Sequence, residues 1–345
     1  MEMSEPKIYI NGRFLTQSMT GTNRFAYELC LQLAKLGYSF QILAPNAPFC
    51  GVYDVGILPI RRVGRLRSHL WEQISLPLFM RGKKSLLVSL KGLGPVFMRR
   101  QVCAIHDMSY LANPAWFSKG YYLFYRLMTP IMVKHAKRIL TVSHFSKQEI
   151  ASRLGVSLDK VRVIYNAPSE QFKQVNESSD STEKYFLTVS SLDPRKNLSL
   201  VFDAYLRSEQ KYPLYVIGEK HTVFGEVTLP ENSQIRFLGR VSDEELRRYY
   251  AHCSLFVYPS LYEGFGMPPM EAIACGCENV VLSDIPVFRE VYGELPQYVK
   301  VDDAEALARI FDAADSVQKD IDFTDFIEKY SWEKSVDQLL SAIED

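Results

Sequence analysis

Two glutamates lie on either side of a glycine turn in the second half of the chain, and Glu271 follows Glu263 by eight positions. An apolar run at residues 255–258 precedes the turn and a proline pair at 268–269 follows it, which predicts a strand, a tight turn and a helix. Backbone N–H groups at such a helix start bind anionic or polyhydroxylated ligands. Glu263 in the turn and Glu271 on the helix's first exposed face are therefore candidate ligand contacts; the alternative is an ordinary cap and a solvated carboxylate. The turn residues that would offer their N–H groups are Gly264, Phe265 and Gly266.

A pair of cations follows another apolar run. Arg195 and Lys196 come after the strand expected at residues 185–189 and before the helix expected at 197–209. Two cations at a strand end beside a helix N-terminus suit a pyrophosphate: Arg195 would bind its oxygens bidentately and Lys196 would act as a point charge. Together they would stabilise the charge on a departing nucleoside diphosphate, in place of a divalent metal. We therefore expect no metal and no other cofactor.

The first half offers candidates at two strand ends. His106 and Asp107 follow the apolar run 102–105, which places both at the carboxyl edge of the predicted sheet. Gly21 would let the backbone approach a ligand, and Arg24 lies in the first turn of the helix that begins there. Gly21, Arg24 and Asp107 are therefore candidate ligand contacts, and the alternative role for Asp107 is to orient its own loop. The segment has no Gly-x-Gly-x-x-Gly pattern, which argues against a dinucleotide-binding oxidoreductase.

Apolar runs alternate with amphipathic segments in both halves, which predicts an α/β fold of two doubly wound parallel-sheet domains. The expected domains are residues 1–168 and 185–328, joined by a polar linker at 169–184 and followed by a helix within 329–345. The expected strands lie at residues 7–10, 40–43, 86–89, 102–105, 138–142, 161–164, 185–189, 214–217, 235–238 and 255–258.

Four motifs in sequence order resemble glycosyltransferase family 4. The two glutamates around the Gly-Phe-Gly turn match the family signature, and residues 190–198 resemble its second phosphate-contacting loop. Residues 237–246 resemble its base-contacting segment, and residues 105–109 its first-domain active-site motif. The resemblance covers nearly the whole chain and implies the GT-B architecture, in which two Rossmann-like domains face a cleft and the terminal helix packs back on the N-terminal domain.

The resemblance also implies roles for single residues. It assigns Arg195 and Lys196 to the donor diphosphate and Glu271 to the nucleotide ribose. Glu263 and the turn N–H groups would meet the sugar hydroxyls, and His106 would contact the same sugar. Gly21 would contact a distal phosphate or the acceptor, and Arg24 and Asp107 would contact the acceptor. The base-contacting segment contributes Gly239 and Val241. The family retains anomeric configuration without an established protein nucleophile, so we expect a front-face substitution in which the leaving phosphate helps to deprotonate the acceptor hydroxyl.

The net charge of zero hides an asymmetry between the halves. Residues 1–168 hold 23 Lys and Arg against 8 Asp and Glu, whereas residues 169–345 hold 17 against 32. Basic residues beside apolar ones predict contact with an anionic membrane surface; a solvated basic face is the alternative. Nucleic acid is not expected, because no recognised module accompanies the charge. The basic residues are Arg61, Arg62, Arg65, Arg67, Arg81, Lys83, Lys84, Arg99 and Arg100, interleaved with Trp71, Leu76, Leu78, Phe79 and Met80.

No run of 18 apolar residues and no apolar leader is present, so we expect a cytoplasmic protein peripherally bound to the inner face of the cytoplasmic membrane. The six cysteines are scattered in apolar contexts, and Cys275-Gly-Cys277 lacks a second ligand pair for zinc, so buried reduced thiols are expected.

The expected function is that of a retaining hexosyltransferase for surface polysaccharide of the O-antigen or capsule type. GDP-mannose is preferred over UDP-glucose as donor, and a lipid-linked oligosaccharide is the expected acceptor. One alternative is a transferase that uses UDP-glucose and a soluble acceptor. Another is a non-catalytic sugar-nucleotide-binding scaffold, which the intact charged residues disfavour.

Overall fold

The computed structural model describes residues 7–172, 183–218, 230–316 and 323–344. It divides into two compact units. The first unit contains Met1–Leu111, Tyr122–Asn166 and Ser331–Asp345, and the second contains Ala112–Tyr121 and Ala167–Tyr330. Residues 173–182 of the expected linker 169–184 lie outside the described residues. Just before them, Phe172 is buried, and its ring lies 6.1 Å from that of Tyr250.

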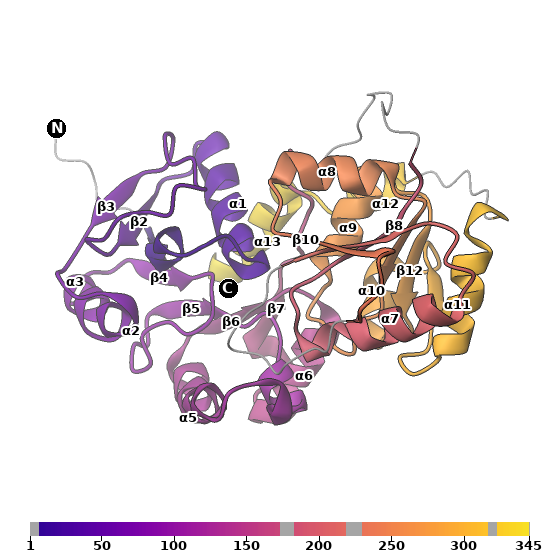
Figure 1. Ribbon diagram of the computed structural model, residues 1–345. Helices are drawn as coiled ribbons and strands as arrows, with labels where there is room; N and C mark the ends of the chain where they lie inside the picture. The colour runs from indigo at the N-terminus through magenta and orange to yellow at the C-terminus, as the bar shows by residue number, and fades with distance from the viewer. Residues whose placement is uncertain (1–6, 173–182, 219–229, 317–322, 345) are drawn as a thin grey trace. The chain divides into compact units, whose positions relative to one another are not determined.

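A seven-stranded parallel sheet forms the centre of the first unit (Figure 1), in the order β3-β2-β1-β4-β5-β6-β7. The order reverses between β1 and β4, and ligands of doubly wound sheets bind outside the carboxyl ends of the strands at such a point. The strands are β1 (Ile8–Asn11), β2 (Phe40–Ala44), β3 (Ile60–Arg62), β4 (Leu86–Ser89), β5 (Gln101–Ala104), β6 (Arg138–Thr141) and β7 (Val161–Val163).

Helices cover this sheet on both faces. One run of helical turns contains α2 (Ser68–Leu70), a π-helical turn (Trp71–Ser75) and α3 (Leu76–Met80). Pro77 has no N–H to donate four residues back, which explains why the regular ladder is broken just before it. Trp71 anchors the run because its indole N–H donates to the Val63 carbonyl at 2.7 Å and its ring is fully buried. The other helices are α1 (Gly21–Lys35), α4 (Ser109–Ala112), α5 (Lys119–His135), α6 (His144–Leu154) and α13 (Trp332–Glu344).

The terminal helix α13 packs against α1. Gln32 donates to the Glu333 carboxylate at 2.9 Å, and the buried Trp332 ring lies 6.1 Å from that of Phe25. The Ser331 hydroxyl accepts the Lys334 N–H at 3.3 Å, as a helix cap does. Trp332 therefore packs inside the first unit.

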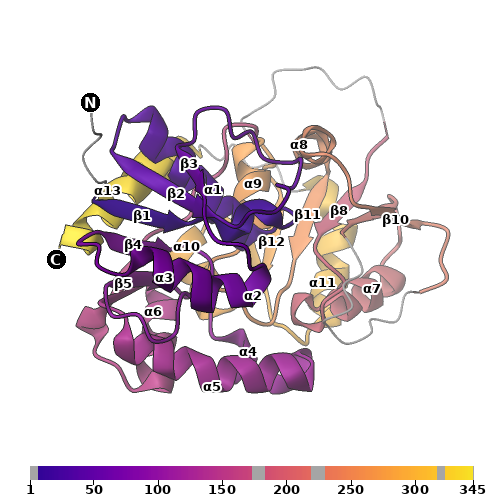
Figure 2. The same ribbon diagram turned by 90° about the vertical axis from the view of Figure 1, so that its left-hand side faces the viewer.

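The second unit repeats the design with six parallel strands in the order β10-β9-β8-β11-β12-β13. Its strands are β8 (Phe186–Val189), β9 (Leu214–Ile217), β10 (Ile235–Gly239), β11 (Leu255–Tyr258), β12 (Val280–Ser283) and β13 (Gln297–Val299). Helices α7 and α11 pack together on one face and α8 and α9 on the other (Figures 1 and 2). These helices and their neighbours are α7 (Leu198–Arg207), α8 (Asp243–His252), α9 (Met267–Ala274), α10 (Pro286–Tyr292), α11 (Ala304–Asp312) and α12 (Thr324–Lys329).

The expected strands are confirmed to within one or two residues at each end. Three strands were not predicted, namely β3, β12 and β13. Among the described residues, no helix is both long enough and apolar enough to cross a bilayer.

The loops after β8, β9 and β10 approach one another closely at the carboxyl edge of the second sheet. The Ser190 N–H donates to the Ile217 carbonyl at 2.9 Å, and the Gly218 N–H donates to the Gly239 carbonyl at 2.9 Å. A Cβ atom on Gly218 would lie 1.8 Å from the Ser190 carbonyl oxygen. Only glycine fits there, so this residue sets the spacing of the loops that form the site below.

Replacing Gly218 with alanine is expected to lower the midpoint of thermal unfolding by about 5 °C or more. The added methyl group would collide with backbone, at a φ of 154° that side chains rarely adopt. Circular dichroism during heating measures the change. Gly120→Ala in α5 is the matched control, because nothing lies within 4 Å of its added Cβ. Equal midpoints for the two variants would contradict this role of Gly218.

Candidate active site

The loop after β8 holds its arginine in a fixed orientation. Asp193 is fully buried and accepts the backbone N–H of Arg195 at 2.9 Å. The same carboxylate accepts Nε of Arg195 at 2.9 Å and lies 2.7 Å from its Nη2. The ring of Phe117, from the short segment that the first half contributes to this unit, lies 5.6 Å from the guanidinium carbon. Arg195 is thus a preorganised cation, positioned by a carboxylate and an aromatic ring.

Lys196 forms a triangle with two residues more than sixty positions away. Its Nζ lies 2.5 Å from Oε1 of Glu263 and donates to the Tyr258 hydroxyl at 2.8 Å. That hydroxyl in turn donates to Oε1 of Glu263 at 2.8 Å. Burial, then the Glu263 charge, raises the pKa of Tyr258 well above its ordinary value, so the hydroxyl keeps its proton. The loops after β8 and β11 are further joined by the Leu261 N–H, which donates to the Arg195 carbonyl at 2.7 Å.

The glycine turn continues this cluster into α9. Gly266 caps the helix at a φ of 93°, and a Cβ there would lie 2.5 Å from the Phe288 ring. Its carbonyl accepts the Tyr292 hydroxyl, which holds the turn against α10. Pro268 and Pro269 have no N–H, so the N–H groups expected at the helix start come from the turn and Met267 rather than from the first full turn of α9.

Glu271 does not lie on an exposed helix face, contrary to the sequence-based expectation. Its side chain is buried and accepts the Tyr250 hydroxyl of α8 at 3.2 Å. Because α8 packs on α9, the Glu271 side chain of α9 faces α8 and not solvent. Burial, then the Glu271 charge, raises the pKa of Tyr250, which keeps it a donor. A ligand contact by Glu271 would therefore share this carboxylate with Tyr250.

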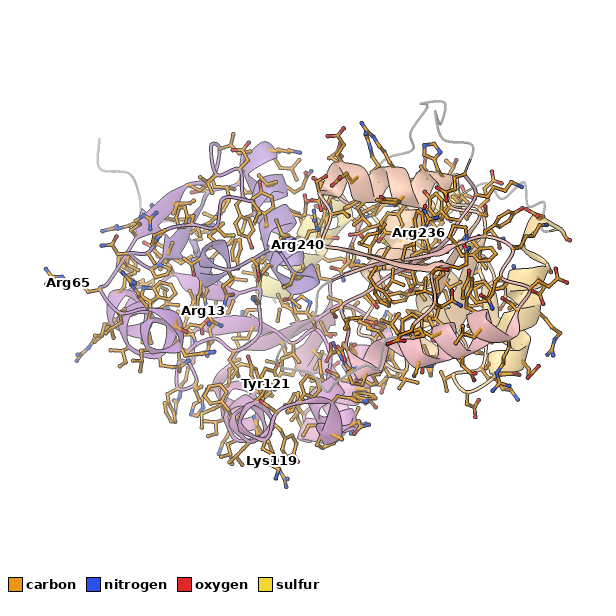
Figure 3. The ribbon with its side chains drawn as sticks, in the orientation of Figure 1. Arg13, Arg65, Lys119, Tyr121, Arg236 and Arg240 are labelled. Atoms are coloured by element: carbon orange, nitrogen blue, oxygen red, sulfur yellow. The ribbon has the colours of Figure 1, made fainter. Side chains whose placement is uncertain are left out.

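The expected base-contacting segment lies at the end of β10. Gly239 is the last residue of that strand, with a φ of 68°, and Val241 is half-buried just before α8. Arg240 between them is exposed, and Figure 3 shows it beyond the strand end. The Ser242 hydroxyl and the Glu245 carboxylate form a capping box that fixes the start of α8. Through Gly218, this segment borders the loop that carries the two cations.

Six candidates thus share one connected set of loops in the second unit: Arg195, Lys196, Glu263, Gly264, Phe265 and Gly266, with Phe265 buried between the glycines. Tyr258, Asp193 and Tyr250 complete it but were not predicted as site residues. An aromatic residue at a strand end and a carboxylate two residues before an arginine were the only signals for the first two. Nothing in the sequence marked Tyr250, because its role depends on how α8 packs.

In the first unit, His106 follows β5 and its Nε2 lies 3.0 Å from the Leu90 carbonyl oxygen. The Phe25 ring meets the imidazole edge-on at 4.9 Å. Burial lowers the pKa of His106 below its ordinary value, so the ring is neutral at pH 7. The Asp107 carboxylate accepts the Ser109 N–H at 2.8 Å, which is the loop-orienting arrangement.

The two N-terminal candidates lie at the start of α1. Arg24 is half-buried, and its backbone N–H donates to the Thr20 carbonyl at 2.8 Å. Gly21 is exposed with open space around its Cβ position, so a larger residue would fit in this structure. The open space leaves room for a ligand to approach the backbone, so the proposed contact of Gly21 stays a prediction.

A buried charged cluster in the first unit was not predicted. Glu72 is 1% exposed and lies 3.0 Å from Nε of Arg13, while Asn11 donates to Glu72 at 2.8 Å. Lys91 donates to Gln17 at 2.6 Å, and burial, followed by the Arg13 charge, lowers the pKa of Lys91 to about 8. Arg13 and Lys91 each follow the end of a strand by two residues, at the point where the strand order reverses; Figure 3 labels Arg13. The place of these two cations after strands at the reversal point was the feature of the sequence that could have predicted this cluster.

The cysteines behave as small apolar residues. All six are free, and four of them are buried. Within the described parts of the chain, no three His, Cys, Asp or Glu side chains come together in a way that could hold a metal ion.

Comparison with known proteins agrees with this architecture. Residues 19–169 match the family model described as Glycosyltransferase Family 4, and residues 169–319 match the one described as Glycosyl transferases group 1. The O-antigen chain mannosyltransferase RfbU of Salmonella typhimurium is 31% identical over 314 residues, 87% of this chain and 83% of that protein. The O-antigen chain mannosyltransferase B of Escherichia coli is 30% identical over 232 residues, 62% of this chain and 61% of that protein.

Among solved structures, Anabaena Alr3699/HepE in complex with UDP and glucose matches with a TM-score of 0.69 and 15% identity, over 99% of this chain and 100% of that one. This is a likeness of fold. The two doubly wound sheets, the two family models and the RfbU identity over most of both chains agree. The chain belongs to glycosyltransferase family 4, and it is a hexosyltransferase with the GT-B fold.

Proposed function

We propose that this enzyme transfers mannose from GDP-mannose to a lipid-linked oligosaccharide during surface polysaccharide synthesis, with retention of anomeric configuration. The triangle of Lys196, Tyr258 and Glu263 beside Arg195 is the observation that carries the proposal. It places two cations and one carboxylate at the carboxyl edge of a doubly wound sheet, where a nucleotide sugar needs partners for both phosphate and hydroxyl groups. The O-antigen mannosyltransferases among the relatives support mannose and a polysaccharide product.

The donor would be held along this edge. Arg195, fixed by Asp193, and Lys196 would bind the diphosphate, and the turn around Gly264 would bring N–H groups to the sugar. Glu263 would accept hydrogen bonds from sugar hydroxyls while it stays close to Lys196. The remaining donor contacts would be Glu271 on the ribose, Gly239 and Val241 on the base, and His106 on the sugar.

In the proposed step, the acceptor hydroxyl oxygen bonds to the anomeric carbon on the face from which the diphosphate departs. The bond between that carbon and the phosphate oxygen breaks, and the hydroxyl proton passes to a phosphate oxygen. Lys196 and Tyr258 both bind Oε1 of Glu263, which would orient the carboxylate so that it accepts hydrogen bonds from the sugar hydroxyls rather than attacking carbon. Arg195 and Lys196 would balance the charge that grows on the diphosphate without a divalent metal. Because the neutral ring of His106 donates from Nε2 to the Leu90 carbonyl, its Nδ1 would accept a hydrogen bond from a sugar hydroxyl without adding charge.

The proposed acceptor and the proposed membrane location rest on features outside the donor site. A lipid-linked acceptor would hold the enzyme at the inner face of the cytoplasmic membrane, and the basic first half would favour an anionic bilayer surface. The acceptor saccharide would meet the first unit, where Arg24 and Asp107 are the proposed contacts.

Purified enzyme is expected to show a thermal shift and slow donor hydrolysis with GDP-mannose, and smaller responses with UDP-glucose and other nucleotide sugars. Excess EDTA is expected to change neither. Transfer to a lipid-linked or short saccharide acceptor should give an α-linked product from the α-linked donor, as measured by the one-bond carbon–proton coupling at the anomeric centre in NMR. A response to UDP-glucose alone would refute the mannose assignment, an inverted product would refute the mechanism, and no response to any donor would refute the transferase.

The triangle predicts coupling between Lys196 and Glu263. Lys196→Met is expected to destabilise the fold by about 2–4 kcal/mol, because it leaves the largely buried Glu263 carboxylate without its cation. The double variant Lys196→Met/Glu263→Gln should regain at least about 1 kcal/mol relative to the summed single changes, measured by urea unfolding. Lys196→Met, Glu263→Gln and the double variant should each lose turnover by 100-fold or more. Strictly additive losses of stability would contradict the ion pair, and near-normal turnover of the double variant would contradict its role.

A further inference from the structure

The helical run over residues 68–80 has apolar side chains on two opposite faces. Trp71, Leu76 and Met80 lie in the core against the sheet. Leu70, Ile74 and Leu78 follow one another at four-residue spacing on the other face and are 62%, 44% and 63% exposed. Such a row of exposed apolar side chains, on a helix already anchored by its opposite face, is a candidate contact surface.

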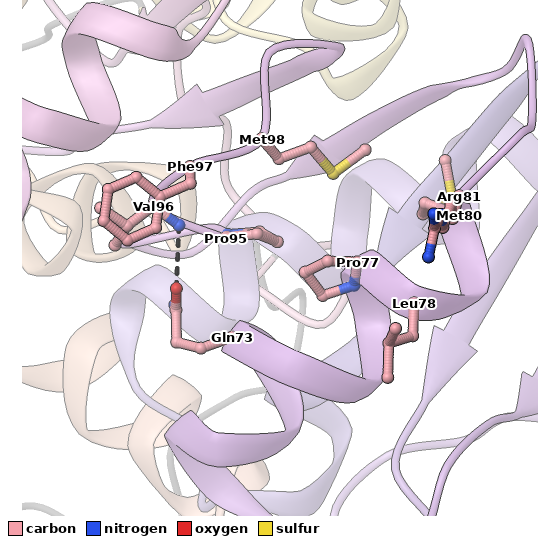
Figure 4. A pocket seen from close by; sticks show the side chains of 9 residues that line it. All are labelled: Gln73, Pro77, Leu78, Met80, Arg81, Pro95, Val96, Phe97 and Met98. Carbon is pink, nitrogen blue, oxygen red and sulfur yellow. Dashed lines mark hydrogen bonds between the residues drawn. The ribbon is translucent and has the colours of Figure 1, made fainter.

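A hollow of about 360 Å³ lies beside this row, between α3 and the loop at residues 95–98. Figure 4 shows its lining, which is almost entirely apolar: Pro77, Leu78, Met80, Val96, Phe97 and Met98. Phe97 stands at its mouth with 77% of its surface exposed, the largest fraction among the exposed large apolar residues in the described chain. The volume falls within the range of small-ligand sites.

The polar groups of the hollow do not suit a sugar or a nucleotide. The Gln73 side chain donates to the Gly94 carbonyl at 3.1 Å and accepts the Val96 N–H at 2.8 Å, so its amide already serves to hold the loop. Arg81 is exposed and lines the rim. A hydrocarbon chain fits such a lining, since it needs no hydrogen-bonding partner.

The surroundings are basic without compensating acids. Between Asp54 and Glu149 the sequence has only two acidic residues, Glu72 and Asp107. Glu72 is buried against Arg13, and Asp107 is committed to the Ser109 N–H, so neither offsets the exposed cations. The exposed cations within residues 61–100 are Arg61, Arg62, Arg65, Arg67, Arg81, Lys84, Arg99 and Arg100, and Arg65 is labelled in Figure 3.

The apolar face continues onto α5. The Phe124 ring lies 5.4 Å from that of His69, and the His135 ring lies 5.9 Å from that of Phe97. Leu123 and Leu127 on the same helix are 56% and 53% exposed. Two helices and a loop therefore share exposed apolar residues within one basic region. An anionic bilayer, which offers both hydrocarbon and negative charge, fits this combination better than a protein partner does.

We propose that the hollow between α3 and residues 95–98, with Leu78 and Phe97 at its mouth, inserts into an anionic bilayer and takes up a lipid hydrocarbon chain. The surrounding cations would bind the lipid phosphates. This inference rests on the membrane-bound acceptor of the proposed function, and it adds the site and the mode of attachment. Attachment would then depend on apolar insertion as well as on charge.

The full-length enzyme is tested by sedimentation with sucrose-loaded vesicles of phosphatidylcholine, with and without 30% phosphatidylglycerol. Leu78→Ser/Phe97→Ser is expected to lower the partition coefficient on the anionic vesicles at least about 10-fold. Leu206→Ser in α7 is the matched control, because Leu206 is also an exposed leucine, 44% exposed, but lies in the second unit. Arg81→Gln/Arg99→Gln is expected to reduce binding at low salt only, whereas the serine variant also loses the residual binding that persists in 1 M salt.

Phe97→Trp provides a direct readout of insertion. Its emission is expected to be quenched by lipids brominated on their acyl chains, with Leu206→Trp unquenched. Unchanged partitioning of the serine variant, absence of quenching, or no binding to any vesicle would overturn the proposal; the last result would point to a protein partner. Donor hydrolysis in solution reports the proposed function separately, so hydrolysis without vesicle binding would reject only the membrane site. Vesicle binding without hydrolysis would reject only the transferase chemistry.

Discussion

The ion pair between Lys196 and Glu263 is the interaction on which the second unit's site depends. It joins the loop after β8 to the loop after β11, 67 positions apart in sequence, and Tyr258 binds both partners. In the free enzyme, Lys196 is thus the counter-charge of Glu263, and in the proposed function it would also bind the donor diphosphate. Because Glu263 already accepts two hydrogen bonds, the site favours a carboxylate that orients sugar hydroxyls over one that attacks carbon. The glycine turn and the Gly218 contact serve to keep these loops at that spacing.

Much of the fold could be predicted because a buried parallel sheet requires apolar strands, and these alternate with amphipathic helices in this chain. Residues 86–89 and 214–217 were predicted with the bounds the structure gives. β3 was missed because its three residues include two exposed arginines, and β13 was missed because it has only three residues, of which one is the polar Gln297. β12 (Val280–Ser283) has the same length and apolar character as the predicted β4, so its apolar run was a signal that the sequence reading overlooked.

The sequence was enough to place the loops that carry the candidate residues at one sheet edge, but it did not reveal the contacts among them. Strand ends followed by Arg-Lys or by Glu-Gly-Phe-Gly identify the carboxyl edge, since all strands of a parallel sheet end there. The position of Glu271 was wrong because its surroundings depend on how α8 packs on α9, which periodicity does not reveal. The same holds for the cluster of Arg13, Glu72 and Lys91, where helical residue Glu72 is brought to two strand ends by the packing of Trp71.

A calorimetric titration of GDP and of GDP-mannose, into the wild-type enzyme and into Glu263→Gln, tests the assigned role of Glu263 most directly. We predict that Glu263→Gln binds GDP at least as tightly as the wild type, because Lys196 is then released from its counter-charge. The extra affinity that mannose gives to GDP-mannose should be lost in the variant. Retention of that increment, or a parallel loss of affinity for both ligands, would contradict a site in which Glu263 holds the sugar and restrains Lys196.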